Sequence, residues 1–518
     1  MEGNLINIED IDLGEEGVES HKFKKLIIII PIITIAITII IIIISICLFA
    51  NKEGKETNKN DNSEKENQKK EEKEEKEEKE EKEEKDKKDL ENLCKTGEND
   101  ECLTCKETQC SSCNYRYDLI NGTCYPTFSI KATYKTNSDN ETIDLIFYLY
   151  EEYIIDMEID KEIVEPTSIY TFNTTGNHTV YFTMNHTKIT TFNSMFSNLD
   201  ELTSIYFSKD FDTQNITSLK GMFYSDKNLV SVDISNMNTE NIEDMVLLFY
   251  DCSSLISIKL PHSSNSNLLN INNMFENCKQ LINVDLSEFN TENIEEMSSL
   301  FSGCKNLVSI NFSNINTQNV KQMDNMFLNC ASIKTIDITN FNTQNVTTMA
   351  NIFKGCSSLI SVDLSFLNTT RLVDMNNMFE DCTSLNNINL TNFQTKYVEN
   401  ISCLFKGCSS LENINLSSFS TKFVKEMSYM FYGCSSLENI NLSNFDTHKV
   451  KTMDYMFAYC SSLIDLDIYG FTDNPDKTCT FKDFFKGNYT SKGKIRYSDS
   501  IENKIKDYIP KGWDKYKI

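Results

Sequence analysis

Phenylalanine marks a 26-residue period through the C-terminal two-thirds of the chain. The period separates successive members of the series Phe223, Phe249, Phe275, Phe301, Phe327, Phe353, Phe379, Phe405, Phe431 and Phe457, and Phe196 precedes them at a spacing of 27. A repeat of this length is typical of a solenoid, because each unit has too small an apolar face to bury alone and must stack on its neighbours. The pattern predicts an elongated surface for binding rather than a pocket for chemistry.

Apolar and polar positions within each unit predict a short strand and a return segment. The spacing Leu437-x-x-Ile440-x-Leu442 predicts a parallel strand with Ile440 and Leu442 facing inward. The Met-x-x-Met-Phe sequence that begins at Met427 has helical spacing and predicts a helical return segment packed against the strand. The expected fold class is therefore a mixed α/β solenoid, a leucine-rich repeat stack of about eleven 26-residue units with short parallel strands.

Nine cysteines follow the repeat: Cys252, Cys278, Cys304, Cys330, Cys356, Cys382, Cys408, Cys434 and Cys460. Neighbouring strands lie about 4.8 Å apart and their identical side chains point the same way. A disulfide needs converging Cβ atoms about 3.8 Å apart, so these residues are expected to be buried free thiols that act as small apolar side chains. Cys403 and Cys479 lie outside the register and receive no assignment.

The N-terminal part of the chain predicts a membrane anchor and a stalk. Residues 26–50 carry no charge and are long enough to span a bilayer as a helix. A cleaved secretory signal is the alternative, but its apolar region is typically about 7–15 residues, so an uncleaved transmembrane signal-anchor is favoured. Residues 1–25 are then a cytosolic N-terminal tail, and the Glu/Lys-rich residues 51–93 form a charged stalk. Lysines flank the span on both sides, so charge alone leaves its orientation open.

Six cysteines in residues 94–126 predict a disulfide module: Cys94, Cys102, Cys105, Cys110, Cys113 and Cys124. The segment has too few apolar residues for a core, so cross-links are expected to stabilise it. Zinc is the alternative for its two CxxC pairs, but only four residues separate them, against about 15–20 in zinc ribbons. Disulfides favour an extracellular position for everything after the span, and their connectivity stays open.

A two-residue alternation then predicts a small β domain at 127–187 that caps the first coil. A hairpin turn is expected at 174–177, between two of its strands. The leucine-rich repeat solenoid extends over 188–470, and residues 471–518 form a C-terminal cap.

The outward position between the two inward strand residues is the candidate ligand-binding face. Asp or Asn occupies it in most units, as Asp233, Asp285, Asn311, Asp337, Asp363, Asn389, Asn415, Asn441 and Asp467. A flat, weakly acidic column of this kind favours a partner-binding face, and a solvated surface without a ligand is the alternative. Four of these residues lie in Asn-x-Ser/Thr sequons, and sugar on them would cover the face: Asn311, Asn389, Asn415 and Asn441.

Other sequons are candidate glycosylation sites, namely Asn121, Asn140, Asn173, Asn177, Asn185, Asn215 and Asn488. The five histidines are scattered, without metal-ligand spacing or a partnered nucleophile, and no glycine-rich phosphate loop occurs. We therefore expect no enzyme activity, no metal and no cofactor. The net charge of −27 argues against nucleic acid as a partner.

Two resemblances add to this interpretation. The pattern MF-x-x-C-S-S-L-x-x-I-x-L-S-x-F-x-T-x-x-V over residues 188–518 resembles the BspA-like leucine-rich repeat surface proteins, in their 26-residue branch, and the C-terminal stretch resembles that family's cap, with Trp513 covering the last coil. The segment CLTCKETQCSSC, followed by YDLINGTCYP, resembles a furin-like, growth-factor-receptor cysteine-rich module. The repeat resemblance implies cell-surface display and adhesion to host, matrix or neighbouring-cell proteins, without catalysis.

The sequence as a whole predicts a single-pass glycoprotein of the plasma membrane with a C-terminal, extracellular ectodomain. Its solenoid is expected to adhere to, or recognise, an extracellular or host protein. Two alternatives stay open: a receptor ectodomain that signals through a partner, and a structural surface-coat protein without a specific ligand.

Overall fold

The computed structural model describes residues 128–517, except 210, 262–266, 477 and 491, together with the backbone of four short strands between 102 and 126. The predicted tail, membrane span and stalk at 1–93 lie outside the described residues. Across the part that is described, no helix combines the length and the apolar character needed to cross a membrane.

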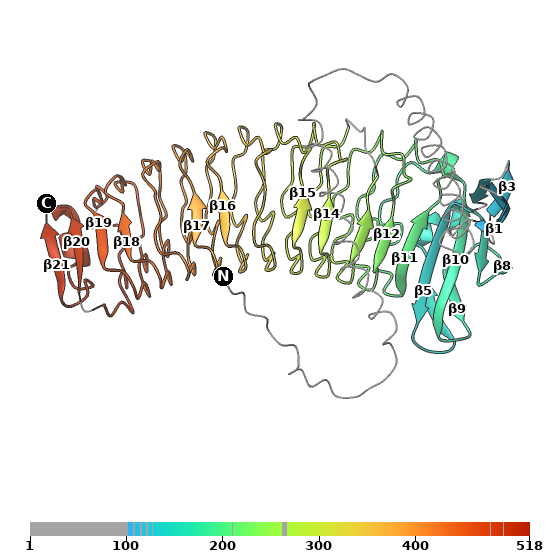
Figure 1. Cartoon of the computed structure of the whole chain (residues 1–518), viewed down its shortest axis with the longest axis horizontal. Coiled ribbons are helices and arrows are strands. Elements are labelled where there is room, and N and C mark those ends of the chain that lie inside the picture. The colour runs from blue at the N-terminus through green and yellow to red at the C-terminus, as the bar shows by residue number, and fades with distance from the viewer. Residues whose placement is uncertain are drawn as a thin grey trace, which may run out of the picture. The chain divides into compact units, whose positions relative to one another are not determined.

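Successive coils of the solenoid pair through short parallel strands along one side (Figure 1). Each pair keeps the 26-residue register, as Ser231 opposite Ser257 and Asn439 opposite Asp465 illustrate. The strands are β11 (Leu202–Phe207), β12 (Ser231–Asp233), β13 (Ser257–Lys259), β14 (Asn283–Asp285), β15 (Ser309–Asn311), β16 (Ser361–Asp363), β17 (Asn387–Asn389), β18 (Asn439–Asn441) and β19 (Asp465–Ile468). There are about eleven coils, so the predicted repeat number and the parallel strands are confirmed.

The middle residue of each three-residue repeat strand faces the core. In β18, Ile440 is buried while Asn439 and Asn441 on either side are exposed, as the alternation of a strand requires. Leu437 and Leu442 flank this strand and are fully buried. The inward orientation predicted for Ile440 and Leu442 is therefore confirmed.

The return segment is not helical, which corrects the predicted mixed α/β fold to a β-solenoid. The backbone N–H of Phe249 donates to the carbonyl of Met274 in the next coil, at 2.9 Å, instead of to its own helical turn. Leu247 and Asp251 have positive φ angles of 60° and 56°, which a right-handed helix excludes. The methionine spacing is thus produced by a row of tight turns, and isolated β-bridges join each turn segment to the next.

The phenylalanine column forms the centre of the core. Every ring from Phe223 to Phe457 is buried, and consecutive rings stack with centroids 5.4–6.0 Å apart. Stacked aromatic pairs stabilise a fold by about 0.5–1.5 kcal/mol beyond the burial of their area. The predicted inward position of these rings is confirmed.

The nine in-register cysteines are buried free thiols, as predicted. Each Sγ donates to the carbonyl oxygen of the phenylalanine in the preceding coil, as Cys330 does to Phe301 at 3.1 Å. Burial raises the pKa of each thiol and keeps it protonated. Cys403 has a positive φ of 56° at the turn position that Asn377 occupies one coil earlier, and Cys479 is buried beside Asn474.

Residues 128–187 form antiparallel strands that extend the solenoid sheet. They are β5 (Ile130–Thr136), β6 (Glu141–Asp144), β7 (Ile154–Ile159), β8 (Glu162–Val164), β9 (Ile169–Phe172) and β10 (Gly176–Met184), with the 3-10 helices η1 (Tyr148–Tyr153) and η2 (His186–Lys188). A seven-stranded sheet has the order β13-β12-β11-β5-β10-β7-β8, with β5 antiparallel to β11. Backbone pairing therefore covers the first coil, which would otherwise end in an open sheet edge.

The predicted hairpin at 174–177 is wrong. The chain does reverse there, but β9 pairs with β6, whereas β10 lies between β5 and β7. Val180, Phe182 and Met184 of β10 are all buried, so this strand lies inside the sheet, and both of its edges are already occupied.

The cysteine module contains two pairs of antiparallel strands. β1 (Cys102–Lys106) pairs with β2 (Gln109–Cys113), and β3 (Tyr117–Ile120) pairs with β4 (Thr123–Pro126). The backbone register places Cys102 opposite Cys113 and Cys105 opposite Cys110. The side chains of this segment lie outside the described part, as does Cys94, so the disulfides stay a prediction.

The C-terminal segment continues the parallel sheet beyond β19. It contains β20 (Gly493–Tyr497), η3 (Asp499–Ile501), α3 (Glu502–Ile505) and β21 (Trp513–Lys517). Trp513 is 5% exposed, and its Nε1 donates to the Thr490 hydroxyl at 3.1 Å. A Cβ at Gly493 would lie 2.6 Å from the indole, so only glycine fits beneath it. Trp513 thus covers the end of the core, as the sequence predicts.

Candidate functional site

The predicted ligand-binding face is a column of Asx turns at the ends of the strands, which we call the Asx column. In nine coils the side-chain oxygen of Asp or Asn accepts the backbone N–H of the residue two positions later, at 2.9–3.2 Å, and Lys259 takes this position in one further coil. All nine predicted residues do so: Asp233, Asp285, Asn311, Asp337, Asp363, Asn389, Asn415, Asn441 and Asp467. Asp and Asn suit this position because only their short side chains close such a turn. The periodicity of the column therefore has an architectural cause.

Hydrogen bonds lower the pKa of three aspartates in the middle of the Asx column. The hydroxyl and backbone N–H of Ser287 lower the pKa of Asp285, and equivalent bonds lower the pKa of Asp337 and Asp363. These carboxylates are exposed, so the column presents negative charge to solvent.

Basic side chains pair with the aspartates at both ends of the Asx column. Lys259 Nζ lies 2.8 Å from Asp233 Oδ2, and Arg496 lies 3.6 Å from Asp467 Oδ2. Between them, in the described coils, Asp285, Asp337 and Asp363 form no ion pair with a basic side chain. A partner with basic groups would therefore meet its strongest attraction at the middle of the column.

The sequons inside the Asx column follow from the same turn chemistry. Asn389 Oδ1 accepts both the backbone N–H and the hydroxyl of Thr391, at 3.2 and 2.7 Å. A turn built from Asn and, two residues later, a small hydroxyl residue is at the same time an Asn-x-Ser/Thr sequence. These four sequons thus have a structural explanation that does not depend on glycosylation, which stays a prediction.

The other candidate glycosylation sites differ in exposure. Asn140, Asn173, Asn177 and Asn215 are exposed, and Asn185 is half-buried. Asn488 is only 6% exposed, and its Nδ2 donates to the Phe457 carbonyl at 2.9 Å, which disfavours it as an acceptor in the folded protein. Asn121 lies outside the described residues.

A second surface, which the sequence analysis did not single out, runs along the edge between the strand and the return segment. In four coils an Asn here donates its Nδ2 to a carbonyl of the preceding coil, at 2.8–3.1 Å, and these residues define the Asn column: Asn241, Asn267, Asn319 and Asn345. The next four coils carry Arg371, Tyr397, Phe423 and Lys449 at the same position. This change of residue type was visible in the sequence as a break in the repeat.

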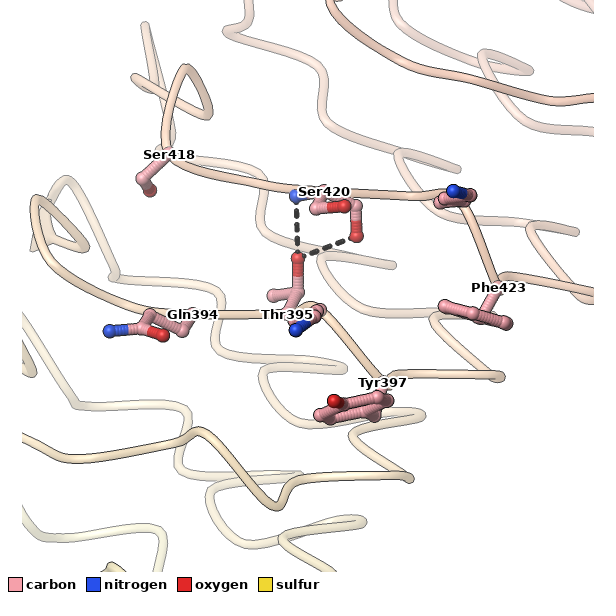
Figure 2. Close-up of a pocket in the computed structure, with 8 residues that line it drawn as sticks. Gln394, Thr395, Tyr397, Ser418, Ser420 and Phe423 are labelled. Atoms are coloured by element: carbon pink, nitrogen blue, oxygen red, sulfur yellow. Dashed lines mark hydrogen bonds between the residues drawn. The ribbon is translucent and has the colours of Figure 1, made fainter.

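A pocket of about 560 Å³ lies where the Asn column ends (Figure 2). The Tyr397 and Phe423 rings from successive coils lie one above the other, with centroids 6.1 Å apart. Lys396 Nζ is 5.0 Å from the Tyr397 ring centroid, and Lys449 Nζ is 4.2 Å from that of Phe423. We call this surface the basic aromatic patch, and it comprises Arg371, Lys396, Tyr397, Lys422, Phe423 and Lys449.

The floor of this pocket is fixed by a ladder of buried threonines. The Thr395 hydroxyl accepts the backbone N–H of Ser420 at 2.8 Å and donates to the Ser420 carbonyl at 2.9 Å (Figure 2). Thr421 forms the same two bonds with Asp446 in the next coil. The backbone that carries both rings is therefore held in place without a ligand.

The acidic, histidine and cysteine side chains of the described part of the chain do not gather into a metal site. No three His, Cys, Asp or Glu side chains there lie close enough together to hold a metal ion. The buried His178 contacts Asp160, with Nδ1 2.6 Å from Oδ2, and packs on Phe172 inside the N-terminal β domain. This histidine holds two elements of that domain together.

Nine solved chains are similar to parts of this chain, and two of them are as follows. One is titled a leucine rich cell surface protein from Faecalibacterium prausnitzii A2-165; it is 18% identical, with a TM-score of 0.28, and the match covers 48% of this chain and 76% of that one. The other is titled a TLR13–ssRNA13 complex; it is 15% identical, with a TM-score of 0.14, and the match covers 52% of this chain and 49% of that one. Both matches are too distant to say anything about function. No curated protein matches the chain.

Four overlapping stretches match the model of one protein family, at residues 169–284, 269–388, 323–413 and 373–496. Together they span 169–496, which is more than half of the 518 residues. The match covers the repeats that carry the BspA-like resemblance and supports it, but it does not reach the cysteines of 94–126, so the furin-like resemblance stays a prediction. The chain belongs to the family described as Mycoplasma protein of unknown function, DUF285.

Proposed function

We propose that this protein is displayed on the cell surface and that its solenoid binds an extracellular partner non-covalently, for adhesion or recognition. In this proposal residues 26–50 anchor the chain, residues 1–25 stay in the cytosol, and the charged residues 51–93 hold the solenoid away from the membrane. The apolar segment and the repeat family support this arrangement.

The observation that carries the proposal is the fixed register of the outward side chains. Strand pairing on one side and turn-segment bridges on the other align every coil with the next. Outward residues 26 positions apart therefore form straight columns on a rigid support. A rigid surface loses little conformational entropy on binding, which is why solenoids suit extended partners.

Attachment of intact cells tests the proposal. Cells that display the full chain should attach to host cells or immobilised matrix proteins in a saturable way, and added soluble chain should compete. Cells of the same strain without the chain are the control. Attachment that does not saturate, or that matches the control, would instead favour a coat protein without a specific ligand.

Protease treatment of the same cells tests the anchored topology. Cleavage should remove the solenoid and leave the first 25 residues protected. A solenoid that resists protease on intact cells but is cleaved after lysis would overturn the surface assignment.

A further inference from the structure

The basic aromatic patch lacks the inter-coil hydrogen bond that the Asn column forms along the same edge. Asn345 donates to the Gln318 carbonyl at 2.8 Å, as the other residues of the Asn column do to theirs. Tyr397 and Phe423 occupy the same position and cannot form that bond. A repeat protein that abandons a stabilising inter-coil bond in adjacent coils has another use for those side chains.

The charge of this edge also changes along the solenoid, from acidic side chains in the first coils to basic side chains in the last ones. The position just before the Asn column carries Glu240, Glu292, Gln318, Gln344, Thr370, Lys396, Lys422 and His448 in successive described coils. Lys396, Lys422 and Lys449 form no ion pair with a carboxylate in the described part of the chain. Asp446 is the acidic group of this edge: it pairs with His448, and the charge of Lys422 also helps to lower its pKa. A chain with a net charge of −27 therefore presents one end of this edge as a positive surface, which attracts an anionic ligand.

The chemistry of the pocket favours a carbohydrate over a peptide. Tyr397 is 48% exposed, and the parts of its ring and of the Phe423 ring that Lys396 and Lys449 do not cover offer apolar surface. The rest of the lining consists of hydroxyl, amide and ammonium groups, among them Gln394 and Ser420. A pyranose has the matching character, with an apolar C–H face and a rim of hydroxyls. A peptide hot spot instead fills a deep apolar pocket that excludes water, which this lining does not provide.

We propose that the basic aromatic patch binds an acidic polysaccharide. Successive sugar rings pack against the exposed edges of Tyr397 and Phe423, and Lys396, Lys422 and Lys449 beside them bind their carboxylate or sulfate groups through charge-assisted hydrogen bonds. The threonine ladder beneath holds both rings in place, so binding requires little reordering. This site deepens the proposed function, on which it rests, by assigning a ligand class to the C-terminal end of the solenoid.

Binding of the purified full chain to defined polymers tests the site. Hyaluronan supplies carboxylates and heparin supplies sulfates, while dextran is the neutral control and poly-L-glutamate is an acidic peptide. At least one of the two acidic polysaccharides should bind, dextran should not, and poly-L-glutamate should bind at least tenfold more weakly. Raising the salt concentration should weaken the interaction, since exposed charges are screened.

The double variant Tyr397→Asn, Phe423→Asn removes both aromatic rings of the patch while the fold is retained. Asn is the residue of the Asn column, so the variant can form the inter-coil hydrogen bonds of that column and is expected to fold. It should lose acidic-polysaccharide binding at least tenfold. Tyr429→Asn is the matched control, because Tyr429 stacks on Tyr455 at 4.9 Å on the return segment, and asparagines occupy its turn position in other coils. This control should bind as the unaltered chain does.

Three outcomes would overturn the site. The first is that neither hyaluronan nor heparin binds; the second is that the double variant binds them unchanged. The third is that poly-L-glutamate binds equally well, which would point to an acidic protein segment as the occupant. If purified polysaccharides fail while displayed chain still gives saturable cell attachment, the inference fails and the proposed function stands.

Discussion

The Asx column and the basic aromatic patch lie on the same coils, but they differ in how regular they are. The Asx column keeps its residue type along the solenoid, whereas the edge that carries the patch changes its residue type. Between Asp233 and Asp467, the Asx column carries Asp or Asn with the same turn bond in every described coil except that of Lys259. The edge keeps its own bond as far as Asn345 and then changes to Arg371, Tyr397, Phe423 and Lys449. A residue type that recurs from coil to coil is thus explained by the fold, whereas a change of residue type at a recurring position indicates a function.

The largest expected effect comes from a regular position in the core. Burial raises the pKa of Cys356 to about 12, from an ordinary value near 9. The protonated thiol therefore stabilises the fold fully below about pH 9, and this stabilisation is lost as the pH rises from there towards 12. At pH 11 the loss from this thiol is about 2–3 kcal/mol. Denaturant unfolding of the Cys356→Ala variant between pH 7 and 11 should show a shallower alkaline decline than the unaltered chain.

Cys403 provides the matched control for that measurement. It lies outside the register and is only half-buried, so Cys403→Ala should change the alkaline decline less than Cys356→Ala does. Equal changes in the two variants would contradict the assignment of the decline to the buried thiol column.

The next effect is expected at the threonine ladder under the edge. The Thr317 hydroxyl accepts the backbone N–H of Asn342 at 2.7 Å and donates to its carbonyl at 3.0 Å, and Thr317 is fully buried. Thr317→Val keeps the shape and removes both bonds, so the free energy of unfolding should fall by about 1–3 kcal/mol. Thr317→Ser keeps the hydroxyl and should lose less. Unfolding midpoints in urea measure both, and a Val variant as stable as the original would show that the edge does not need this ladder.

The sequence predicts the regular part of this molecule well. Period, inward Ile440 and Leu442, the stacked phenylalanines and the free thiols all follow from one constraint, which is that identical units must bury identical faces. The same reasoning placed the Asx column outward but did not recognise its turn bonds, because a polar residue facing solvent suits both a ligand face and a turn.

The return segment shows why the remainder was harder to predict. Its Met and Phe spacing fits a helix. The backbone is nevertheless not helical, because alternate N–H groups donate to carbonyls of the next coil. Asn351, Asn377 and Gly355 at positive φ were the available signal, because these residues favour the left-handed region. The partner of β9 could not be read from a local turn, because strand order depends on which edges other strands already occupy.

A smaller effect is expected in the Asx column itself. Asn389→Ala removes the acceptor for the Thr391 N–H and hydroxyl, so it should lower the free energy of unfolding by about 1 kcal/mol. Asn389→Asp keeps the acceptor and should be nearly neutral. Neither variant should alter polysaccharide binding at the patch, because the two surfaces use different side chains. A weaker binding constant in both would show that the surfaces are coupled and would break the comparison.

The smallest effect on stability is expected at Tyr397, where the edge already lacks the asparagine of the Asn column. Tyr397 is half-exposed and its ring contributes nothing to the core, whereas Asn at this position can donate to the preceding coil as Asn345 does. Loss of ring contacts with Phe423 and gain of an inter-coil bond therefore oppose each other, and the free energy of unfolding of Tyr397→Asn should stay within about 0.5 kcal/mol of the original. Urea unfolding measures this shift. A loss of more than about 2 kcal/mol would mean that the tyrosine is part of the architecture after all, and the departure from Asn at this edge would then need no ligand to explain it.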